Sequence, residues 1–372
     1  MNNRIVYFNG SLPYKGKAPV GGGEVGNMRT LRMLQSFGYK TKVIRRIRSN
    51  AADSKVKRMI TYPFRVLHNL CRFFFVLICG DRKNGIVHVA GFYGPTISIE
   101  CAQVFIAKML GYKLIYEMRG GGAENYYNNG SEYYRKQFRF CIRKADHIFS
   151  QGKENEILLK KLCSTPVFYY PNCVQKEFYP DILPVKPKDK IRLLFFGRIE
   201  EEKNPLLIVD VAALLQKEYD NITLTIIGNG QSEILAQVKS KMNTMLSDGS
   251  YELLPGCEHD KLQSLISDKH FYIFPSVQPR EGQSNAITES MSFGIIPIAS
   301  PQGFNRSTIG DDSLIIESLR AEEYAMRIKD IIAKGKIEYY SQYVRKRFME
   351  NYTEEAVFSS AAKMYETIFK EQ

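Results

Sequence analysis

Short apolar runs alternate with longer amphipathic segments in the first half of the chain. Runs of this kind predict buried strands, and the periodic segments between them predict helices. We expect strands at Arg4–Phe8, Lys40–Ile44, Gly85–Val89, Lys113–Glu117 and His147–Ser150, and helices at Glu24–Phe37 and Thr96–Leu110. Strands that alternate with helices of this length indicate βαβ units and a parallel sheet.

The same alternation restarts after a segment rich in proline and lysine, Asp181–Lys190, which we interpret as an interdomain linker. The strands expected beyond it are Ile191–Phe196, Thr223–Ile227, Tyr251–Leu254, Phe271–Phe274 and Ile296–Ala299, and the helices are Pro205–Lys217, Ser232–Leu246, Asp260–Ile266 and Ala286–Phe293. The tail predicts one more helix, whose apolar positions share a docking face: Phe358, Ala361, Tyr365 and Ile368. We therefore predict an α/β fold with domains over residues 1–182 and 183–350 and a C-terminal helix over 351–372.

The composition is compatible with two domains and indicates the cellular compartment. The chain has 372 residues, of which 44% are hydrophobic, so each half can bury a core. Apolar stretches are much shorter than the roughly 20 residues of a spanning helix, and the first one is too short for a signal peptide. We expect a cytoplasmic protein whose seven scattered cysteines are reduced thiols and not zinc ligands.

Positive charge is concentrated in one segment. The formal net charge is +13, and the segment from Lys42 to Lys83 contains eleven basic residues opposed only by Asp53 and Asp81. A local patch of this kind indicates an anionic partner such as lipid headgroups, nucleic acid or a polyphosphate.

Two cations follow the first strand of the second half. Gly197 and Arg198 come directly after that strand, and Lys203 lies five residues beyond Arg198. Strand ends in open α/β sheets border the ligand crevice, so both cations could neutralise a diphosphate. The alternative is that they are solvated cations beside Glu200–Glu202.

Two carboxylates, Glu281 and Glu289, flank a short polar segment that opens a helix. This segment comprises Gln283, Ser284, Asn285 and Ala286. Its backbone N–H groups would lie at a helix N-terminus, which favours an anion. Two hydroxyl-binding carboxylates on either side of an anion site suit a nucleotide sugar, whereas the alternative is a capped helix with two surface acids.

Two groups of glycines could approach a ligand. Gly228 and Gly230 follow a strand and either admit a ligand close to the backbone or form an ordinary turn. Gly21, Gly22 and Gly23 precede the first helix and either hold a phosphate or an acceptor or form a flexible loop. No GxGxxG follows the first strand, which disfavours a nicotinamide-dependent enzyme.

The candidate residues after the strands of the second half, taken in their order along the chain, resemble the large family of retaining glycosyltransferases with the GT-B fold and the E-x7-E motif. Within that family the chain is most similar to the bacterial surface-polysaccharide type. Three further segments are similar to that family: Ala145–Ser150, Tyr170–Val174 and Phe274–Ser276. The resemblance extends over nearly the whole chain, and the ordered set is more specific than E-x7-E alone. It implies two facing Rossmann-like domains, with the C-terminal helix crossing back to the first.

The resemblance also implies roles for the candidate residues. A nucleotide-sugar donor carrying UDP, GDP or ADP would bind residues 183–350, and a glycan acceptor would bind residues 1–182. Arg198 and Lys203 would contact the diphosphate in place of a metal ion, and no cofactor would be needed. Glu281 would position the donor sugar and Glu289 would bind the ribose. Further donor contacts would come from Gly197, Gly228, Gly230, Gln283, Ser284, Asn285 and Ala286.

Two positions depart from the family pattern. Many members have a histidine at the end of the fourth strand of the first domain, where this chain has Arg119. We expect Arg119 to face an anion, as part of an acceptor or phosphate loop with Gly21–Gly23. The motif interior is Gly282-Gln283-Ser284 and not the commoner Pro-Phe-Gly, which would alter contacts to the sugar.

The segment Met59–Gly80 mixes aromatic and basic side chains. Such a segment can lie in a membrane interface, or it can be a core helix with a solvated basic edge. The first interpretation predicts that residues 42–83 contact an anionic membrane surface at the inner face of the cell membrane. A polyprenyl-diphosphate-linked acceptor for O-antigen, capsule or exopolysaccharide synthesis would be available there.

Three other functions remain open. A GT-B-like sugar-nucleotide epimerase would convert its donor without an acceptor. A non-catalytic anion- or nucleic-acid-binding protein would use the basic patch, although the chain contains no recognised nucleic-acid motif, and we expect no nucleic-acid partner. A catalytically inactive subunit of another transferase would not need a donor motif, so the intact motif argues against that function.

Overall fold

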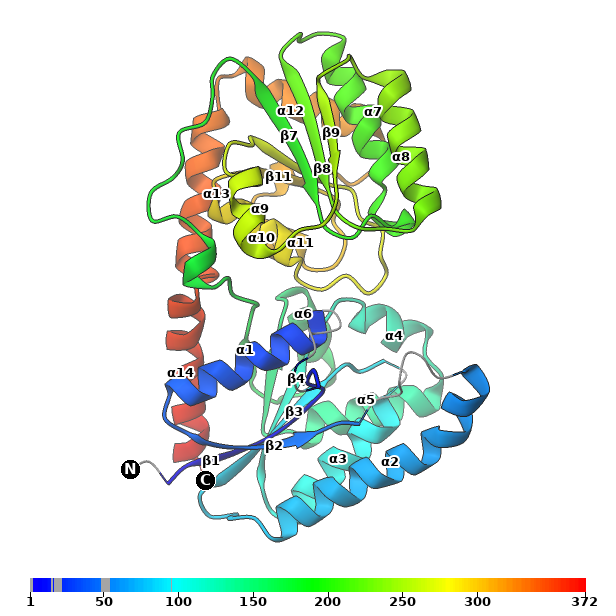
Figure 1. Cartoon of the computed structure of the whole chain (residues 1–372). Coiled ribbons are helices and arrows are strands. Elements are labelled where there is room, and N and C mark those ends of the chain that lie inside the picture. The colour runs from blue at the N-terminus through cyan, green and yellow to red at the C-terminus, as the bar shows by residue number, and fades with distance from the viewer. Residues whose placement is uncertain (1–2, 15, 17–21, 48–53, 95) are drawn as a thin grey trace. The chain divides into compact units, whose positions relative to one another are not determined.

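The computed structural model describes residues 3–14, 16, 22–47, 54–94 and 96–372. The chain divides into two compact units (Figure 1). Unit 1 comprises Met1–Tyr170 and Phe358–Gln372, and unit 2 comprises Pro171–Val357. The expected boundary at residues 182–183 lies after this division, because residues just before it hydrogen-bond within unit 2: Arg345 Nη2 donates to the Pro180 carbonyl at 2.5 Å.

Unit 1 contains a parallel sheet of six strands in the order β2-β1-β3-β4-β5-β6. The strands are β1 (Ile5–Gly10), β2 (Lys40–Arg45), β3 (Gly85–Gly91), β4 (Lys113–Met118), β5 (His147–Ser150) and β6 (Val167–Tyr169). Every residue of β3 is buried, as expected for a central strand covered on both faces.

Helices cover both faces of this sheet. They are α1 (Gly22–Ser36), α2 (Lys55–Ile78), α3 (Ile97–Met109), α4 (Ala123–Asn129), α5 (Glu132–Lys144) and α6 (Glu154–Leu162). The β1–β2 connection runs toward one edge of the sheet and the later connections run toward the other. Right-handed crossovers therefore place α1 on one face and α2, α3 and α5 on the other, where α3 contacts both neighbours (Figure 1).

The last helix, α14 (Glu354–Lys370), begins in unit 2 and ends in unit 1. Its Tyr365 ring packs against Phe37, His88 and Phe149, so this end of α14 covers the α1 face of the sheet. Tyr365 and Ile368 are completely buried, which explains the apolar face that the sequence shows in this segment.

Unit 2 contains a parallel sheet of five strands in the order β11-β10-β7-β8-β9. The strands are β7 (Ile191–Phe196), β8 (Ile222–Ile227), β9 (Tyr251–Leu254), β10 (Phe271–Phe274) and β11 (Ile296–Ala299). The helices are α7 (Pro205–Gln216), α8 (Ser232–Met245), α9 (His259–Ile266), α10 (Asn285–Ser292), α11 (Asn305–Ile309), α12 (Ala321–Ala333) and α13 (Ile337–Asn351), with short 3₁₀ helices η1 (Lys176–Phe178), η2 (Glu201–Lys203) and η3 (Asp312–Leu314).

The strand order of unit 2 reverses at its first strand. From β7 the chain proceeds to β8 and β9 on one side and then returns to β10 and β11 on the other. In open parallel sheets, ligands bind outside the carboxyl ends of the strands at such a switch point. The loops after β7 and β10 are therefore the ones best placed to form a site.

The predicted α/β class with two parallel sheets is confirmed. The structure adds elements that the sequence pattern did not predict, namely β6, α4, α5, α6, α11, α12 and α13. It also makes α2 one helix of 24 residues that includes Pro63. Within the described part of the chain, no helix is both long and apolar enough to cross a bilayer.

Candidate functional site

A buried ion pair lies at the switch point of unit 2. Lys203, at the end of η2, is 7% exposed, and its ammonium group pairs with the carboxylate of Glu281. The Ser276 hydroxyl donates to the same carboxylate at 3.0 Å, and Lys203 Nζ lies 4.9 Å from the centre of the Phe274 ring. Residues 78 positions apart in sequence thus meet beside the carboxyl ends of β7 and β10.

Backbone contacts hold the two loops together at this pair. Val277 N donates to the Glu202 carbonyl at 2.8 Å, and the Asn204 side chain donates to the Pro275 carbonyl at 2.8 Å. Asn204 ends η2 with a left-handed φ of 49°, a conformation that asparagine tolerates better than most residues. The lysine is thereby fixed against the loop that carries Glu281.

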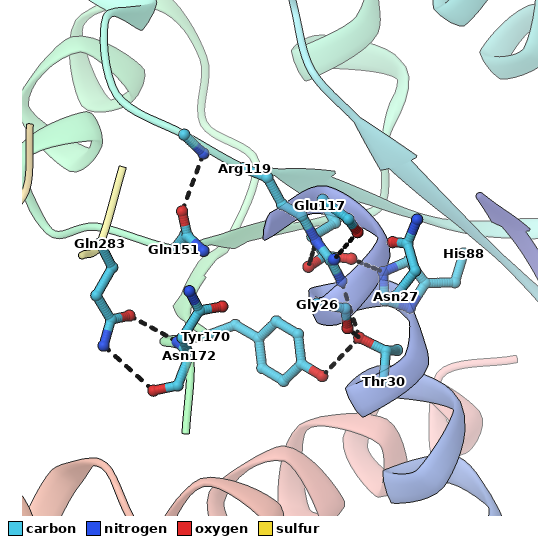
Figure 2. Close-up of polar contacts among 12 residues, drawn as sticks. Gly26, Asn27, Thr30, His88, Glu117, Arg119, Gln151, Tyr170, Asn172 and Gln283 are labelled. Atoms are coloured by element: carbon cyan, nitrogen blue, oxygen red, sulfur yellow. Dashed lines mark hydrogen bonds and ion pairs between the residues drawn. The ribbon is translucent and has the colours of Figure 1, made fainter. Parts of the chain in front are cut away.

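The first turn of α10 is anchored to the segment that enters unit 2. The Gln283 side chain accepts from Asn172 N at 2.6 Å and donates to the Asn172 carbonyl at 3.2 Å (Figure 2). Asn172 also donates to Asn285 Oδ1 at 2.9 Å. Ser284 is the N-cap residue, and its side chain makes no capping hydrogen bond. Gln283 and Asn285 therefore position the helix N-terminus, which sequence reasoning assigned only to ligand contact.

Glu289 lies inside α10 and is 8% exposed. Its carboxylate is 3.7 Å from His259 Nε2. Burial raises the pKa of Tyr272, and the negative charges of Glu281 and Glu289 raise it further. The Tyr272 hydroxyl donates to the Phe196 carbonyl, at the end of β7, at 3.0 Å. Both carboxylates are thus close enough to act on one buried tyrosine of β10.

Gly228 and Gly230 extend the pairing of β7 with β8. Gly197 N donates to the Ile227 carbonyl at 3.0 Å, and Ile199 pairs with Gly230 beyond the strand ends. A Cβ atom on Gly228 would lie 1.9 Å from the Gly197 carbonyl oxygen, and one on Gly230 would lie 2.1 Å from that of Ile199. Close packing of two backbones therefore requires both glycines, and their contact with a ligand stays a prediction.

A cavity of about 280 Å³ adjoins this turn. Its wall includes Gly228, Asn229, Lys239, Leu254 and Pro255, so it is mostly apolar with one cation. The cavity lies beside the loop after β8, at the carboxyl edge of the sheet.

The two cations predicted together have different environments. Lys203 is buried, whereas the Arg198 side chain is 68% exposed and pairs with Glu200 at 2.6 Å. Of the two, Lys203 is the one that the fold holds in place, and Arg198 can change rotamer at little cost.

A second polar network is buried in unit 1 around Arg119. This residue follows β4, is 6% exposed, and donates from Nε to Glu117 at 2.5 Å. Its other nitrogens donate to Thr30 Oγ1 at 2.9 Å and to the Gly23 carbonyl at 3.2 Å (Figure 2). A Cβ atom on Gly26 would lie 2.2 Å from Arg119 Nη1, so Gly26 leaves room for the guanidinium. Arg119 thus links the end of β4 to α1 through Gly23 and Thr30.

The glycine loop predicted to hold a phosphate or acceptor lies partly within the described residues. Gly22 and Gly23 begin α1, whereas Gly21 lies outside the described ranges. The carbonyl of Gly23 is a partner of Arg119. The structure therefore connects two of the predicted residues, and their role toward a ligand stays a prediction.

The network continues from Glu117 to the C-terminal helix. His88 Nε2 lies 2.9 Å from Glu117 Oε2, and His88 Nδ1 lies 2.5 Å from the Tyr365 hydroxyl. Burial raises the pKa of Glu117, but the charge of Arg119 and the hydrogen bond from His88 outweigh it and lower this pKa to about 2. Because an ionised carboxylate can only accept hydrogen bonds, His88 Nε2 donates to Glu117.

Sequence reasoning missed His88, Glu117 and Tyr365 as one network. The only signal was a polar residue, His88 or Glu117, buried inside each of two mostly apolar strands, β3 and β4. The pairing itself depends on α14, 277 positions beyond His88. Within the described ranges, no cluster of three or more His, Cys, Asp or Glu side chains is suited to hold a metal ion.

The two units have the architecture of GT-B glycosyltransferases. Residues 181–347 match the family model described as Glycosyl transferases group 1. Nearly all of unit 2, including the Lys203–Glu281 pair, lies in the matched segment, which confirms the resemblance to group 1 glycosyl transferases there.

Known relatives are distant. Over 231 residues the chain is 22% identical to a component of the phosphatidylinositol N-acetylglucosaminyltransferase of Arabidopsis thaliana, a match that covers 61% of this chain and 50% of that protein. The chain thus spans about half the length of this curated relative.

Solved structures share the fold over nearly the whole chain. A glycosyltransferase from Rickettsia africae ESF-5 has a TM-score of 0.75 at 16% identity, with 100% of both chains covered. Anabaena Alr3699/HepE in complex with UDP has a TM-score of 0.68 at 11% identity, with 98% of this chain and 100% of that chain covered. At these identities the likeness establishes the fold alone.

Proposed function

We propose that this protein is a retaining glycosyltransferase that moves a sugar from a nucleotide-sugar donor to a hydroxyl group of a lipid-linked glycan. The observation that carries this proposal is the buried Lys203–Glu281 pair at the switch point of unit 2. A fixed cation beside a carboxylate offers one group for a phosphate and one for sugar hydroxyls. The match of residues 181–347 to a glycosyltransferase family model supports this interpretation.

The diphosphate of the donor would lie against Lys203, Arg198 and the first turn of α10. The hard step is the build-up of negative charge on the nucleoside diphosphate as it leaves an oxocarbenium-like sugar. A preorganised cation and helix N–H groups stabilise that charge without reorganisation, and neither a metal ion nor another cofactor is required. The relative from Anabaena was solved in complex with UDP, which supports a nucleotide donor.

The rest of the donor would occupy the surrounding groups. Glu289 would accept hydrogen bonds from the ribose, and Glu281 would orient the sugar ring. The cavity beside Gly228 is where we place the base, because its mostly apolar wall suits a flat ring. Gly197 and Gly230 would let the backbone approach the ligand closely.

The acceptor would bind unit 1 near Arg119 and the start of α1. A lipid carrier is supported by the basic, aromatic helix α2 and by the Arabidopsis relative, whose name specifies phosphatidylinositol. We place the protein on the inner face of the cell membrane, where O-antigen, capsule and exopolysaccharide precursors are assembled.

The experiment that tests the donor site is a thermal-shift screen with nucleoside diphosphates and nucleotide sugars. A ligand that binds only the folded state stabilises it, by about 2.7 kcal/mol at a concentration of 100 Kd. We expect one base to raise the Tm clearly. Lys203→Met and Glu289→Ala should lose most of that shift, whereas Lys346→Ala, which removes a cation that is 77% exposed on α13, should keep it.

Several outcomes would redirect the assignment. If no nucleotide or nucleotide sugar raises the Tm, the donor site does not exist. Conversion of the donor without an acceptor would favour an epimerase. With an acceptor, a product whose anomeric NMR coupling shows the donor's configuration supports retention, and the opposite configuration refutes it.

A further inference from the structure

Helix α2 presents a row of exposed apolar side chains along its whole length. Their spacing of three, four or eight positions puts them on one face of the helix. We call this face the outer stripe: Val56 (62% exposed), Ile60 (60%), Phe64 (70%), Leu67 (61%), Phe75 (63%) and Ile78 (53%). A different face of α2 carries Phe73 and Leu77, which are buried in the core of unit 1. The core therefore covers this second face near the C-terminal end of the helix and leaves the outer stripe exposed.

The charged side chains of α2 are all positive. The helix contains no aspartate or glutamate. Arg58, Arg65 and Arg72 recur every seven positions, so they form a row along one flank of the outer stripe. Lys55 and Lys57 add positive charge to the first turn. The exposed surface of α2 thus combines a continuous apolar strip with a parallel line of cations.

We infer that α2 lies flat on an anionic lipid surface, with the outer stripe in the acyl-chain boundary and the arginine row at the lipid phosphates. A helix of 24 residues is about 36 Å long, yet none of the described helices is apolar enough to span a bilayer. A long helix with one apolar side and a cationic flank is typical of interfacial binding. The inference deepens the proposed function, because it names the surface that would hold the protein beside a lipid-linked acceptor.

Charge decides against the other partners that could cover this face. A second copy of α2 packed along the stripe would bring two arginine rows together without any acidic residue to pair with them, whereas coiled-coil flanks normally carry opposite charges. A nucleic acid bound to the arginine row would leave the six apolar side chains beside that row without an apolar partner. An anionic bilayer satisfies the stripe and the arginines at once, because it offers both hydrocarbon and phosphate.

The absence of tryptophan makes a direct test simple. Because the chain has none, Phe64→Trp supplies a single reporter on the outer stripe. With vesicles of phosphatidylcholine and phosphatidylglycerol we expect a blue shift of its emission and quenching by brominated acyl chains. Tyr339→Trp, at a position 62% exposed on α13 of unit 2, is the matched control and should show neither effect.

Second substitutions separate the roles of the stripe and the arginine row. With the Phe64→Trp reporter, the pair Arg65→Gln and Arg72→Gln should weaken partitioning about twenty-five-fold, since each cation near an anionic surface contributes a factor of about five. Added salt should weaken binding similarly. Leu67→Gln should also reduce vesicle binding. The Tm of this variant should stay unchanged, because the Leu67 side chain is exposed. Lys334→Gln with Lys346→Gln, exposed cations of unit 2, should leave binding intact.

Two results would overturn the inference. One is a Phe64→Trp emission that mixed vesicles do not change at low salt. The other is a lipid-free dimer that Leu67→Gln dissociates, which would assign the stripe to a second copy. Nucleotide thermal shifts on the same variants keep the two proposals apart: vesicle binding without any nucleotide shift removes the proposed function alone, and the reverse removes the inference alone.

Discussion

At the scale of single residues, each unit is organised around a buried positive charge. Lys203 meets Glu281 in unit 2, and Arg119 meets Glu117 in unit 1. A buried pair is weak support for stability, but removal of one partner leaves an unpaired charge and is strongly destabilising. At such a pair, the stability of the fold depends on both charged partners being present and in contact, and not only on the burial of each side chain.

The Glu117–Arg119 pair gives a prediction about stability. Glu117→Gln leaves Arg119 without its counter-charge in the core, so we expect a loss of about 3 kcal/mol at neutral pH. For a unit of this size that corresponds to a fall in Tm on the order of 10 °C. Differential scanning fluorimetry of the tyrosine signal measures it, and Glu132→Gln, whose side chain is 54% exposed, should change the Tm far less.

The same variant predicts a pH dependence of definite sign. The pKa of Glu117 is about 2 in the fold, below its ordinary value of 4.5, so its stabilising contribution is present above pH 4.5 and is lost as the pH falls toward 2. The difference in Tm between wild type and Glu117→Gln should therefore narrow over that range. A difference that stays constant down to pH 2 would contradict the low pKa.

At the scale of elements, the strands were the most predictable feature. Parallel strands buried on both faces are apolar runs, and β3 and β10 have every residue buried. Their carboxyl ends also located the residues of the candidate site, since loops after parallel strands share one edge of the sheet. That local pattern was enough to place Lys203 and Glu281 at the correct edge.

Contacts that depend on distant segments could not be predicted in this way. β6 has three residues and too little pattern to recognise, and α12 and α13 follow one another without a strand between them. The Lys203–Glu281 contact requires knowledge that β10 lies beside β7. For α2, the sequence left open whether its apolar residues face the core or a membrane, and the structure shows that separate faces are buried and exposed.

The extension of β7 and β8 beyond their ends predicts the effect of a single methyl group. Gly230→Ala would place Cβ 2.1 Å from the Ile199 carbonyl oxygen, so the two loops must separate. We expect a loss of about 1–3 kcal/mol, the usual cost of overpacking, together with weaker nucleotide binding in the thermal-shift screen. Gly94→Ala is the control, because its nearest neighbour would be at 3.5 Å; equal effects at both positions would refute the packing argument.

At the scale of the whole molecule, unit 1 depends on the last residues of the chain. Residues 358–372 supply Tyr365 and Ile368 to its core, and burial of each such side chain contributes about 1.5–3 kcal/mol. A stop codon after Val357 should therefore make unit 1 sensitive to limited proteolysis while unit 2 still responds to nucleotide. Mass spectrometry of the fragments reads this out, and cleavage that begins in unit 2 would contradict it.

Because unit 1 is built from two stretches separated by all of unit 2, the order of synthesis and the order of folding differ. Domains usually fold from the N-terminus as they leave the ribosome. Here residues 171–357 emerge in full before the closing segment of the first unit does. Until then the α1 face of the first sheet lacks α14, so the nascent chain exposes the apolar surface that Tyr365 and Ile368 later cover, and we expect chaperones to shield it. Unit 2 is the first unit that can be completed.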